Sequence, residues 1–269
     1  MNNPSKTEAV ATDRRQKILD HLDLVRSSSY EELAEMLGVS AMTIRRDVDS
    51  LVESAVVIKT LGGFRRASDG AANLYESALR SRLLLQHGEK LAIARKTLEL
   101  LKPGSTVFID GGTTCLELAK LIGREMKGIT IVTNSILVCR DIGQNENHEI
   151  IGLGGQYDPA SLSFVGSGCE EEAGKYFADM AVFSTKAFRP AEGMFESFIP
   201  TMRIKQIVAK QCRRVVLLAD HTKFGLHALR KALDISQIHE VVTDAAVSPK
   251  DLAVLRAKGK TVRVADDKP

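Results

Sequence analysis

Residues 29–47 read SYEELAEMLGVSAMTIRRD and predict two short helices joined by a tight turn. Ser29 and Glu32 have the spacing of a capping box, which marks the start of the first helix. Gly38 is the kind of residue that ends a helix in the left-handed conformation, and Ser40 can cap the helix that follows. The stretch therefore predicts a helix-turn-helix.

The second of these helices has one apolar face and one polar face. Ile44, Val48 and Leu51 recur at helical spacing and should be buried. A helix that presents hydroxyl and guanidinium groups from its first turns has what is needed to read the major groove of DNA. The candidate DNA-binding residues of this helix are Ser40, Met42, Thr43, Arg45 and Arg46.

Residues 56–66 follow as a short apolar strand, a Gly-Gly turn and a basic strand, which predicts a β-hairpin. A hairpin after a recognition helix makes a winged helix. The candidate DNA contacts of this wing are Lys59, Gly62, Gly63, Arg65 and Arg66. The alternative is a small three-helix domain with a solvated charged face, but caps, turn, buried face and hairpin together favour DNA binding.

The composition is that of an ordinary globular protein of two domains, with 269 residues and 44% hydrophobic content. Residues 1–70 hold ten Lys and Arg against eleven Asp and Glu, which argues against a non-specific, charge-driven DNA binder. We expect a cytoplasmic protein, because the N-terminus is polar and no run of eighteen apolar residues occurs. The four Cys are widely spaced, which predicts reduced thiols and no metal site.

The predicted organisation has four parts. We expect a disordered N-terminus over 1–12, a winged helix-turn-helix domain over 13–67, a linker helix over 68–87 and an α/β sensor and oligomerisation domain over 88–269. A first helix from Asp13 to Arg26 should turn Ile18, Leu22 and Val25 inward. Beyond residue 88, helices alternate with strands, as in a parallel sheet. The predicted strands are 106–110, 129–133, 149–153, 180–184, 215–220, 240–243 and 261–265.

Glycine and hydroxyl residues follow several of these strands. Ligands of open parallel sheets bind at the carboxyl ends of the strands, and N–H groups at a helix start favour phosphate. Ordinary strand-to-helix loops would explain each stretch alone. The candidate effector-binding residues are Asp110, Gly111, Gly112, Thr113, Thr114, Thr133, Asn134, Ser135, Gly154, Gly155 and Lys223.

The sequence resembles the DeoR family of bacterial transcriptional regulators. Residues 38–47 match the G-V-S-x-x-T-I-R-R-D block of that family, and residues 90–94, 110–114, 133–135, 154–155 and 220–224 follow its effector domain in order. The wing departs from the family at Lys59 and Leu61, where Arg and His are usual, and Ala55 replaces a usual Gly. The match is poor between Ser161 and Phe198. The resemblance implies a sensor fold related to ribose-5-phosphate isomerase and a phosphorylated sugar as effector.

We therefore expect a repressor of a carbohydrate uptake or catabolic operon that a phosphorylated sugar releases from double-stranded operator DNA. The chain should form a homodimer or homotetramer, because paired half-sites match a two-fold axis. It should use no cofactor, no metal and no catalytic residue, and contact no membrane. One alternative is an isomerase-like enzyme with an appended DNA-binding domain, in which Asp110 and Lys223 act as base and cation, with Glu192 and Glu196 as other acids. The other alternative is an activator of the same architecture.

Overall fold

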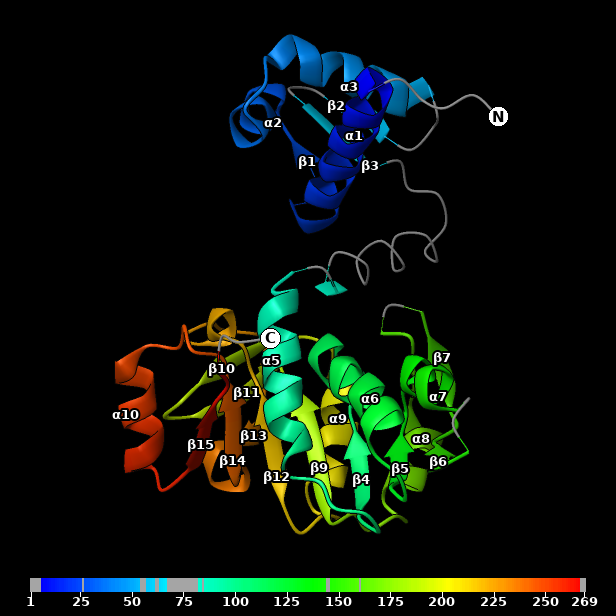
Figure 1. Cartoon of the computed structure of the whole chain (residues 1–269), viewed down its shortest axis with the longest axis vertical. Helices are drawn as coiled ribbons and strands as arrows, with labels where there is room; N and C mark the ends of the chain where they lie inside the picture. The colour runs from blue at the N-terminus through cyan, green and yellow to red at the C-terminus, as the bar shows by residue number, and fades with distance from the viewer. Residues whose placement is uncertain are drawn as a thin grey trace. The chain divides into compact units, whose positions relative to one another are not determined.

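The chain divides into two compact units, residues 1–84 and 85–269 (Figure 1). The computed structural model describes residues 6–25, 27–53, 57–60, 63–66, 82–83, 85–143, 146–159 and 161–266. The predicted linker helix, residues 68–87, lies outside these residues except at 82–83 and 85–87. Among the described residues, no helix has the length and apolar character needed to cross a bilayer.

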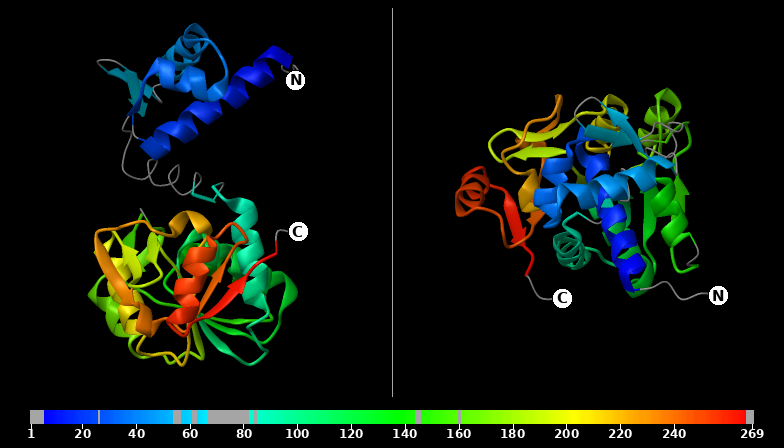
Figure 2. Two further views of the ribbon diagram at one scale, coloured as in Figure 1. Left: turned by 90° about the vertical axis from the view of Figure 1, so that its left-hand side faces the viewer. Right: turned by 90° about the horizontal axis from the view of Figure 1, so that it is seen from above.

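The first unit is a three-helix domain with a small antiparallel sheet, seen from two more directions in Figure 2. Its strands follow the order β1-β3-β2, so the predicted hairpin is joined by a third, two-residue strand. The elements are α1 (Lys6–Val25), β1 (Ser27–Ser28), α2 (Tyr30–Leu37), α3 (Ala41–Glu53), β2 (Val57–Thr60) and β3 (Gly63–Arg66).

Local capping explains where the helices begin and end. The Ser29 hydroxyl accepts from the Glu32 N–H and the Glu32 carboxylate reaches back to the Ser29 N–H, which completes the capping box. Gly38 ends α2 at φ 64°, in the left-handed region. Ser40 then accepts from the N–H of Thr43 at 3.2 Å and starts α3. These contacts set the helix-turn-helix that the sequence predicts.

The core of this unit is apolar. It consists of Ile18, Leu22, Leu33, Ile44, Val48, Leu51, Val57 and Phe64. Two expectations for α1 were wrong. Val25 is 45% exposed at the end of α1, beyond Leu22, the last described residue of the helix that belongs to the core. The helix begins at Lys6, where we expected disorder up to residue 12, because the stretch that includes Glu8, Ala9 and Ala11 favours helix.

The second unit is built on a seven-stranded sheet in the order β15-β14-β12-β9-β4-β5-β6, and every neighbouring pair is parallel. The strands are β4 (Thr106–Ile109), β5 (Thr130–Thr133), β6 (Glu149–Gly152), β9 (Met180–Ser184), β12 (Val215–Leu218), β14 (Glu240–Thr243) and β15 (Thr261–Val264). All seven were predicted within two residues. The central strands are buried because helices or strands cover both faces.

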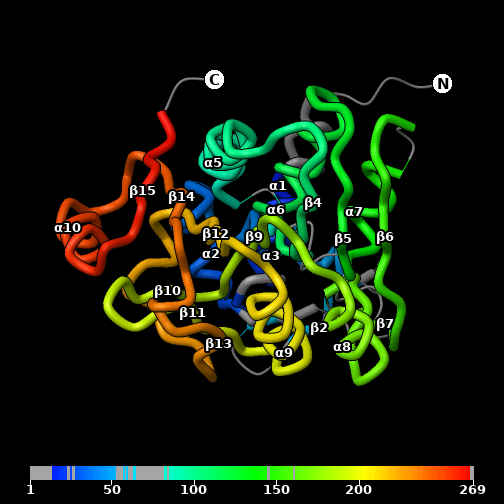
Figure 3. The backbone as a smooth tube through the Cα atoms, turned by 90° about the horizontal axis from the view of Figure 1, so that it is seen from below, coloured from blue at the N-terminus to red at the C-terminus, as the bar shows by residue number. Residues whose placement is uncertain are grey.

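Helices flank this sheet on both sides (Figures 1 and 3). The elements α5 (His87–Leu98) and α6 (Thr113–Glu125) pack together on one face, with α7 (Ile136–Ile142) beside α6. The elements α8 (Ser167–Ala173) and α9 (Ile199–Val208) cover the other. Helix α10 (Pro249–Ala257) packs beside β15 at the edge of the sheet (Figure 2).

Five short antiparallel strands were not predicted. They form a hairpin of β7 (Gln156–Asp158) and β8 (Ser163–Val165), and a sheet of β10 (Ala187–Arg189), β11 (Gly193–Glu196) and β13 (Arg230–Asp234). Much of this structure comes from residues 161–198, the stretch that matches the DeoR family poorly. It lies close to the strand ends and so changes the candidate site.

Candidate functional site

Helix α3 presents a polar face opposite its buried one. Met42 is 58% exposed, and Arg45 and Arg46 are also exposed. The guanidinium of Arg45 lies 4.9 Å from the centre of the Tyr30 ring, a cation–π distance. For Arg46, the described part of the chain offers no hydrogen-bond or ion-pair partner. Arg46 is therefore the side chain of α3 best placed to contact a base edge.

The hydroxyls at the start of α3 are partly engaged within the protein. Ser40 Oγ caps the helix and lies 2.9 Å from the Thr43 hydroxyl. Each hydroxyl keeps some hydrogen-bonding capacity, because it can both donate and accept.

One of the predicted wing cations is paired within the protein. Lys59 on β2 pairs with Asp49 of α3 at 2.7 Å, and this hydrogen bond raises the pKa of Lys59. A Cβ at Gly63 would overlap the carbonyl oxygen of Ser28, so close packing against β1 explains this glycine without DNA. Gly62 and the side chains of Arg65 and Arg66 lie outside the described residues.

The sheet order brings most of the predicted effector residues to one edge. The carboxyl ends of β4, β5 and β6 are neighbours, and they lead into Asp110, Asn134 and Gly154. Strand β12, which leads to Lys223, is separated from β4 by β9. We call the group formed by residues 110–114, 133–135, 184, 196 and 205 the strand-end site.

The start of α6 is an open helix N-terminus. Gly112 is its N-cap residue and has no side chain to cap it. Among the described residues, none accepts from the main-chain N–H groups of 111–115 or bonds to the Thr113 hydroxyl. Such groups favour an anion, because they point along the axis at the positive end of the helix dipole.

The start of α7 differs, because the protein itself occupies it. Ser135 Oγ accepts from the Val138 N–H, and the Ile136 N–H donates to Leu162 O at 3.1 Å. The Thr133 hydroxyl donates to Ile109 O at 2.7 Å and accepts from the Ser135 N–H. Thr133 and Ser135 are therefore held in structural contacts.

Asn134 is buried beside these residues. Its Nδ2 donates to Phe164 O at 2.8 Å, on strand β8. Its Oδ1 is buried and has no partner among the described residues. An unsatisfied buried acceptor is costly, so a ligand or water that donates to Oδ1 would relieve that cost.

Of the two predicted glycines after β6, only Gly155 has a structural explanation. Gly154 is exposed and a Cβ there would meet nothing within 4 Å. Gly155 has φ 143°, and a Cβ would approach both Cys169 Cβ and Val165 O to 2.8 Å. Close packing against the β7–β8 hairpin and α8 therefore accounts for Gly155.

Lys223 lies in the turn after β12. Asp220 caps this turn by accepting from the Thr222 N–H at 3.0 Å, and its other oxygen lies 4.0 Å from Lys223 Nζ. The Lys223 side chain is 34% exposed. A pair this long leaves the ammonium available for another anion.

A buried ionic cluster, which the sequence did not predict, completes the strand-end site. Lys205 of α9 is only 4% exposed, and its Nζ lies 3.2 Å from Asp110 Oδ2, 2.6 Å from Glu196 Oε1 and 2.8 Å from Ser184 O. Ser184 also donates to Asp110 Oδ2, from N–H at 3.1 Å and from Oγ at 2.7 Å. Burial alone would lower the pKa of Lys205, but the carboxylates of Asp110 and Glu196 outweigh it and raise that pKa.

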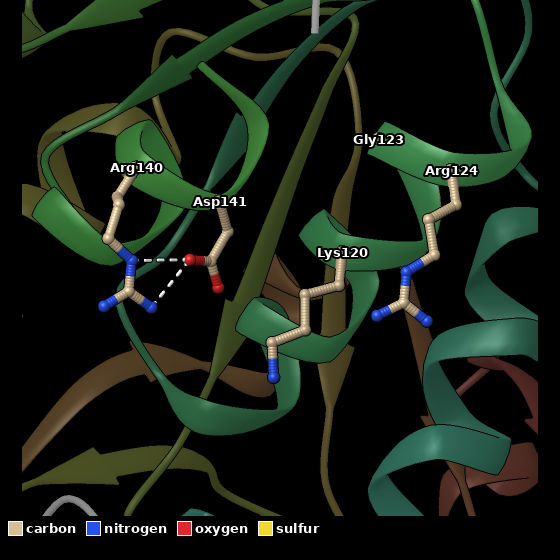
Figure 4. A pocket seen from close by; sticks show the side chains of 5 residues that line it. All are labelled: Lys120, Gly123, Arg124, Arg140 and Asp141. Atoms are coloured by element: carbon tan, nitrogen blue, oxygen red, sulfur yellow. Dashed lines mark hydrogen bonds and ion pairs between the residues drawn. The ribbon is translucent and has the colours of Figure 1, made fainter. Parts of the chain in front are cut away.

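The structure also has a basic cleft between α6 and α7, about 320 Å³ in volume, lined by Lys120, Gly123, Arg124, Arg140 and Asp141 (Figure 4). Arg140 pairs with Asp141, and Lys120 pairs with Glu117. Arg124 and Arg140 lie in the last turns of their helices, where cations are stabilised by the dipole. Because Lys120 is seven residues along α6 from Thr113, the cleft is about 10 Å from the open N-terminus.

Both units match known domains. Residues 14–69 match the DeoR-like helix-turn-helix domain, and residues 85–245 match the DeoR C terminal sensor domain. The chain belongs to the DeoR family. It is thus a transcriptional regulator with a DNA-binding domain and a sensor domain, and the predictions of family and fold class are confirmed.

Relatives in this family match over most of the chain. The lactose phosphotransferase system repressor of Lactococcus lactis subsp. lactis is 31% identical over 245 residues, which cover 89% of this chain and 93% of that one. The glycerol-3-phosphate regulon repressor of Escherichia coli (strain K12) is 30% identical over 227 residues, covering 83% and 88%. A solved ribose 5-phosphate isomerase A from Neisseria gonorrhoeae is 18% identical at a TM-score of 0.38, covering 50% and 52%, too weak a likeness to support a functional conclusion.

These matches decide against the enzyme alternative. A member of the DeoR family is a regulator, and its C-terminal domain is a sensor. The geometry agrees, because Asp110 is already paired with a buried ammonium and hydrogen-bonded twice by Ser184. Oδ2 of Asp110 is therefore occupied by contacts within the protein.

Proposed function

We propose that this protein represses an operon for carbohydrate uptake or catabolism and that a phosphorylated sugar, bound at the strand-end site, releases it from its operator. The named relatives repress a lactose phosphotransferase system and a glycerol-3-phosphate regulon. A DNA-binding regulator of this kind works in the cytoplasm on double-stranded operator DNA. The sensor needs no cofactor beyond the effector.

The observation that carries this proposal is the open N-terminus of α6. Its unpartnered N–H groups and the Thr113 hydroxyl suit the three acceptor oxygens of a phosphate. Lys223 follows strand β12, two strand spacings or about 10 Å from β4, on the same edge of the sheet. Its long side chain would add a charge-assisted bond to the phosphate or to a sugar hydroxyl.

The test pairs ligand binding with operator release. Candidate sugar phosphates are titrated calorimetrically into the wild type, Thr113→Ala and Lys223→Ala, and the same proteins are assayed for release of operator DNA. We expect Lys223→Ala to bind about 10- to 100-fold more weakly, because it loses a hydrogen bond to a charged group. Thr113→Ala should act in the same direction, while both variants bind operator DNA normally.

Lys250→Ala is the matched control, because Lys250 is exposed on α10, far along the sheet from β4. Equal ligand affinity of the wild type and Lys223→Ala would show that Lys223 does not contact the ligand. If no sugar phosphate bound at all, the proposed effector class would be wrong.

We further propose that the protein acts as a homodimer or homotetramer. One winged helix contacts a single half-site, and a two-fold axis places two recognition helices one DNA turn apart. Light scattering of the protein with and without operator DNA gives the mass of the assembly. A monomer bound to a single half-site would contradict this proposal.

A further inference from the structure

The buried cluster at the strand-end site carries two carboxylates and one ammonium. Asp110, Glu196 and Lys205 come from the end of β4, the end of β11 and the middle of α9. Their side chains are 10%, 11% and 5% exposed. With one positive and two negative charges, the cluster has an excess negative charge beside the open start of α6.

Lys205 is held inside the protein. Its Nζ donates to Glu196 Oε1 and Ser184 O and forms an ion pair with Asp110 Oδ2 at 3.2 Å. Because its side chain is only 5% exposed, Lys205 offers little to a ligand. Its role is to fix the Asp110 carboxylate in place, which makes Lys205 a positioning residue.

The two oxygens of Asp110 have different environments. Among the described residues, the contacts of the carboxylate, from Lys205 and from both donors of Ser184, all go to Oδ2. None of the described residues donates to Oδ1, and this oxygen is not fully enclosed by protein atoms. Oδ1 therefore still reaches solvent, directly before the Gly111-Gly112 turn that leads into α6.

We propose that Asp110 selects effectors by a hydroxyl group and excludes those with a carboxylate at that position. An ionised carboxylate only accepts hydrogen bonds, so Oδ1 can bind a hydroxyl donor but repels another anion. The side chains of Asp110 and Glu196 are only 10% and 11% exposed, so this repulsion acts in a poorly solvated place. The phosphate would lie at the start of α6, and the hydroxyl-bearing end of the same molecule would reach Asp110.

This inference rests on the proposed phosphate site, and it narrows the ligand class to phosphorylated polyols and sugars as against phosphorylated sugar acids. It is tested with pairs of probes that share a phosphate and differ only at the far end. Glycerol 3-phosphate is paired with 3-phosphoglycerate, and glucitol 6-phosphate with 6-phosphogluconate. Inorganic phosphate serves as the probe without a far end.

Calorimetric titration into the wild-type protein should show the hydroxyl member of at least one pair binding tenfold or more tightly than its acid partner. Asp110→Asn should weaken binding of the hydroxyl member about tenfold and reduce the preference within the pair to less than threefold. Asp141→Asn, the same change in the basic cleft, should leave all affinities as in the wild type.

Glu196→Gln is the second variant, and it tests the charge of the cluster without changing Asp110. It should strengthen binding of the acid member at least threefold more than binding of its hydroxyl partner, because the phosphate is common to both and only the acid has a carboxylate next to the cluster. Thermal unfolding of each variant verifies that it is folded before titration. If Asp110→Asn does not fold, Glu196→Gln still tests the charge argument.

The possible failures are distinguishable. Equal wild-type affinity for both members of each pair would overturn this inference and leave the phosphate site intact. Tighter binding of the acids would also overturn it. Absence of binding by every probe, inorganic phosphate included, would overturn the proposed function itself.

Discussion

Lys205 Nζ lies 3.2 Å from Asp110 Oδ2, and both side chains are almost removed from solvent. The pair joins α9, which covers one face of the sheet, to the carboxyl end of β4 within it. A buried ion pair of this kind holds its partners in one arrangement, but each charge is costly if left alone. The arrangement of the strand-end site therefore depends on Lys205.

Lys205→Met should destabilise the sensor unit by about 3–5 kcal/mol, because two carboxylates would remain buried without a counterion. Urea unfolding gives the free energy of unfolding. Lys250→Met, at an exposed position of α10, is the control and should change little. The triple variant Lys205→Met, Asp110→Asn, Glu196→Gln should recover much of the loss, and no recovery would mean that charge is not the cause.

The loss caused by Lys205→Met should not vary between about pH 6 and about pH 9. The pKa of Lys205 is raised above the ordinary value of 10.5, so its stabilisation is fully present below that value and disappears only as the pH rises through the folded pKa. Unfolding curves of both proteins across this range measure the difference. A difference that shrank steadily toward pH 9 would contradict the raised pKa.

Arg46→Ala should weaken binding to the operator by about 1–3 kcal/mol and relax the sequence preference at one position. The fold should be unchanged, because Arg46 is exposed and has no described partner. Gel-shift titration at fixed salt against single-base operator variants measures both effects. Arg124→Ala removes the same charge from the sensor unit and is the control. Undiminished affinity of Arg46→Ala would exclude Arg46 from base recognition.

Asp49→Asn should strengthen binding to all DNA sequences alike. The change breaks the 2.7 Å pair between Asp49 and Lys59, which are 46% and 53% exposed, and so frees Lys59 for a phosphate.

Lys59→Ala should instead lower the slope of log affinity against log salt by about one. Glu125→Gln in the sensor unit is the charge control. A change of preference at one base would mean that the wing reads sequence.

The main sheet could be predicted from the sequence because its strands carry their own signal. Met180–Ser184 was predicted with the observed bounds, since a strand buried on both faces is a continuous apolar run. The short strand Arg230–Asp234 gives no such signal, because three of its five residues are exposed. Its pairing with β11 is a tertiary contact.

The candidate site was predicted only in part for the same reason. Asp110 was expected at a strand end, but nothing near Lys205 in the sequence indicates that this lysine is buried against it. Gly155 shows the opposite case, in which a glycine expected to admit a ligand is explained by packing against Cys169. The residue types were visible in the sequence, and their partners were not.

Gly112→Ala should lower the stability of the sensor unit by about 1–3 kcal/mol, as overpacking does, and weaken effector binding without affecting operator DNA. The backbone of Gly112, at φ −76°, accepts alanine, so strain is not the cause. The added Cβ would instead overlap the Ser184 hydroxyl and lie 2.7 Å from Ser184 Cβ, which forces the end of β9 away from Asp110. Thermal unfolding and phosphate titration measure the two effects.

Gly168→Ala, where a Cβ meets nothing within 4 Å, is the control. Adding Ser184→Gly removes the obstructing atoms and should restore part of the lost stability. A double variant no more stable than Gly112→Ala would show that the contact with Ser184 is not the reason for glycine at position 112.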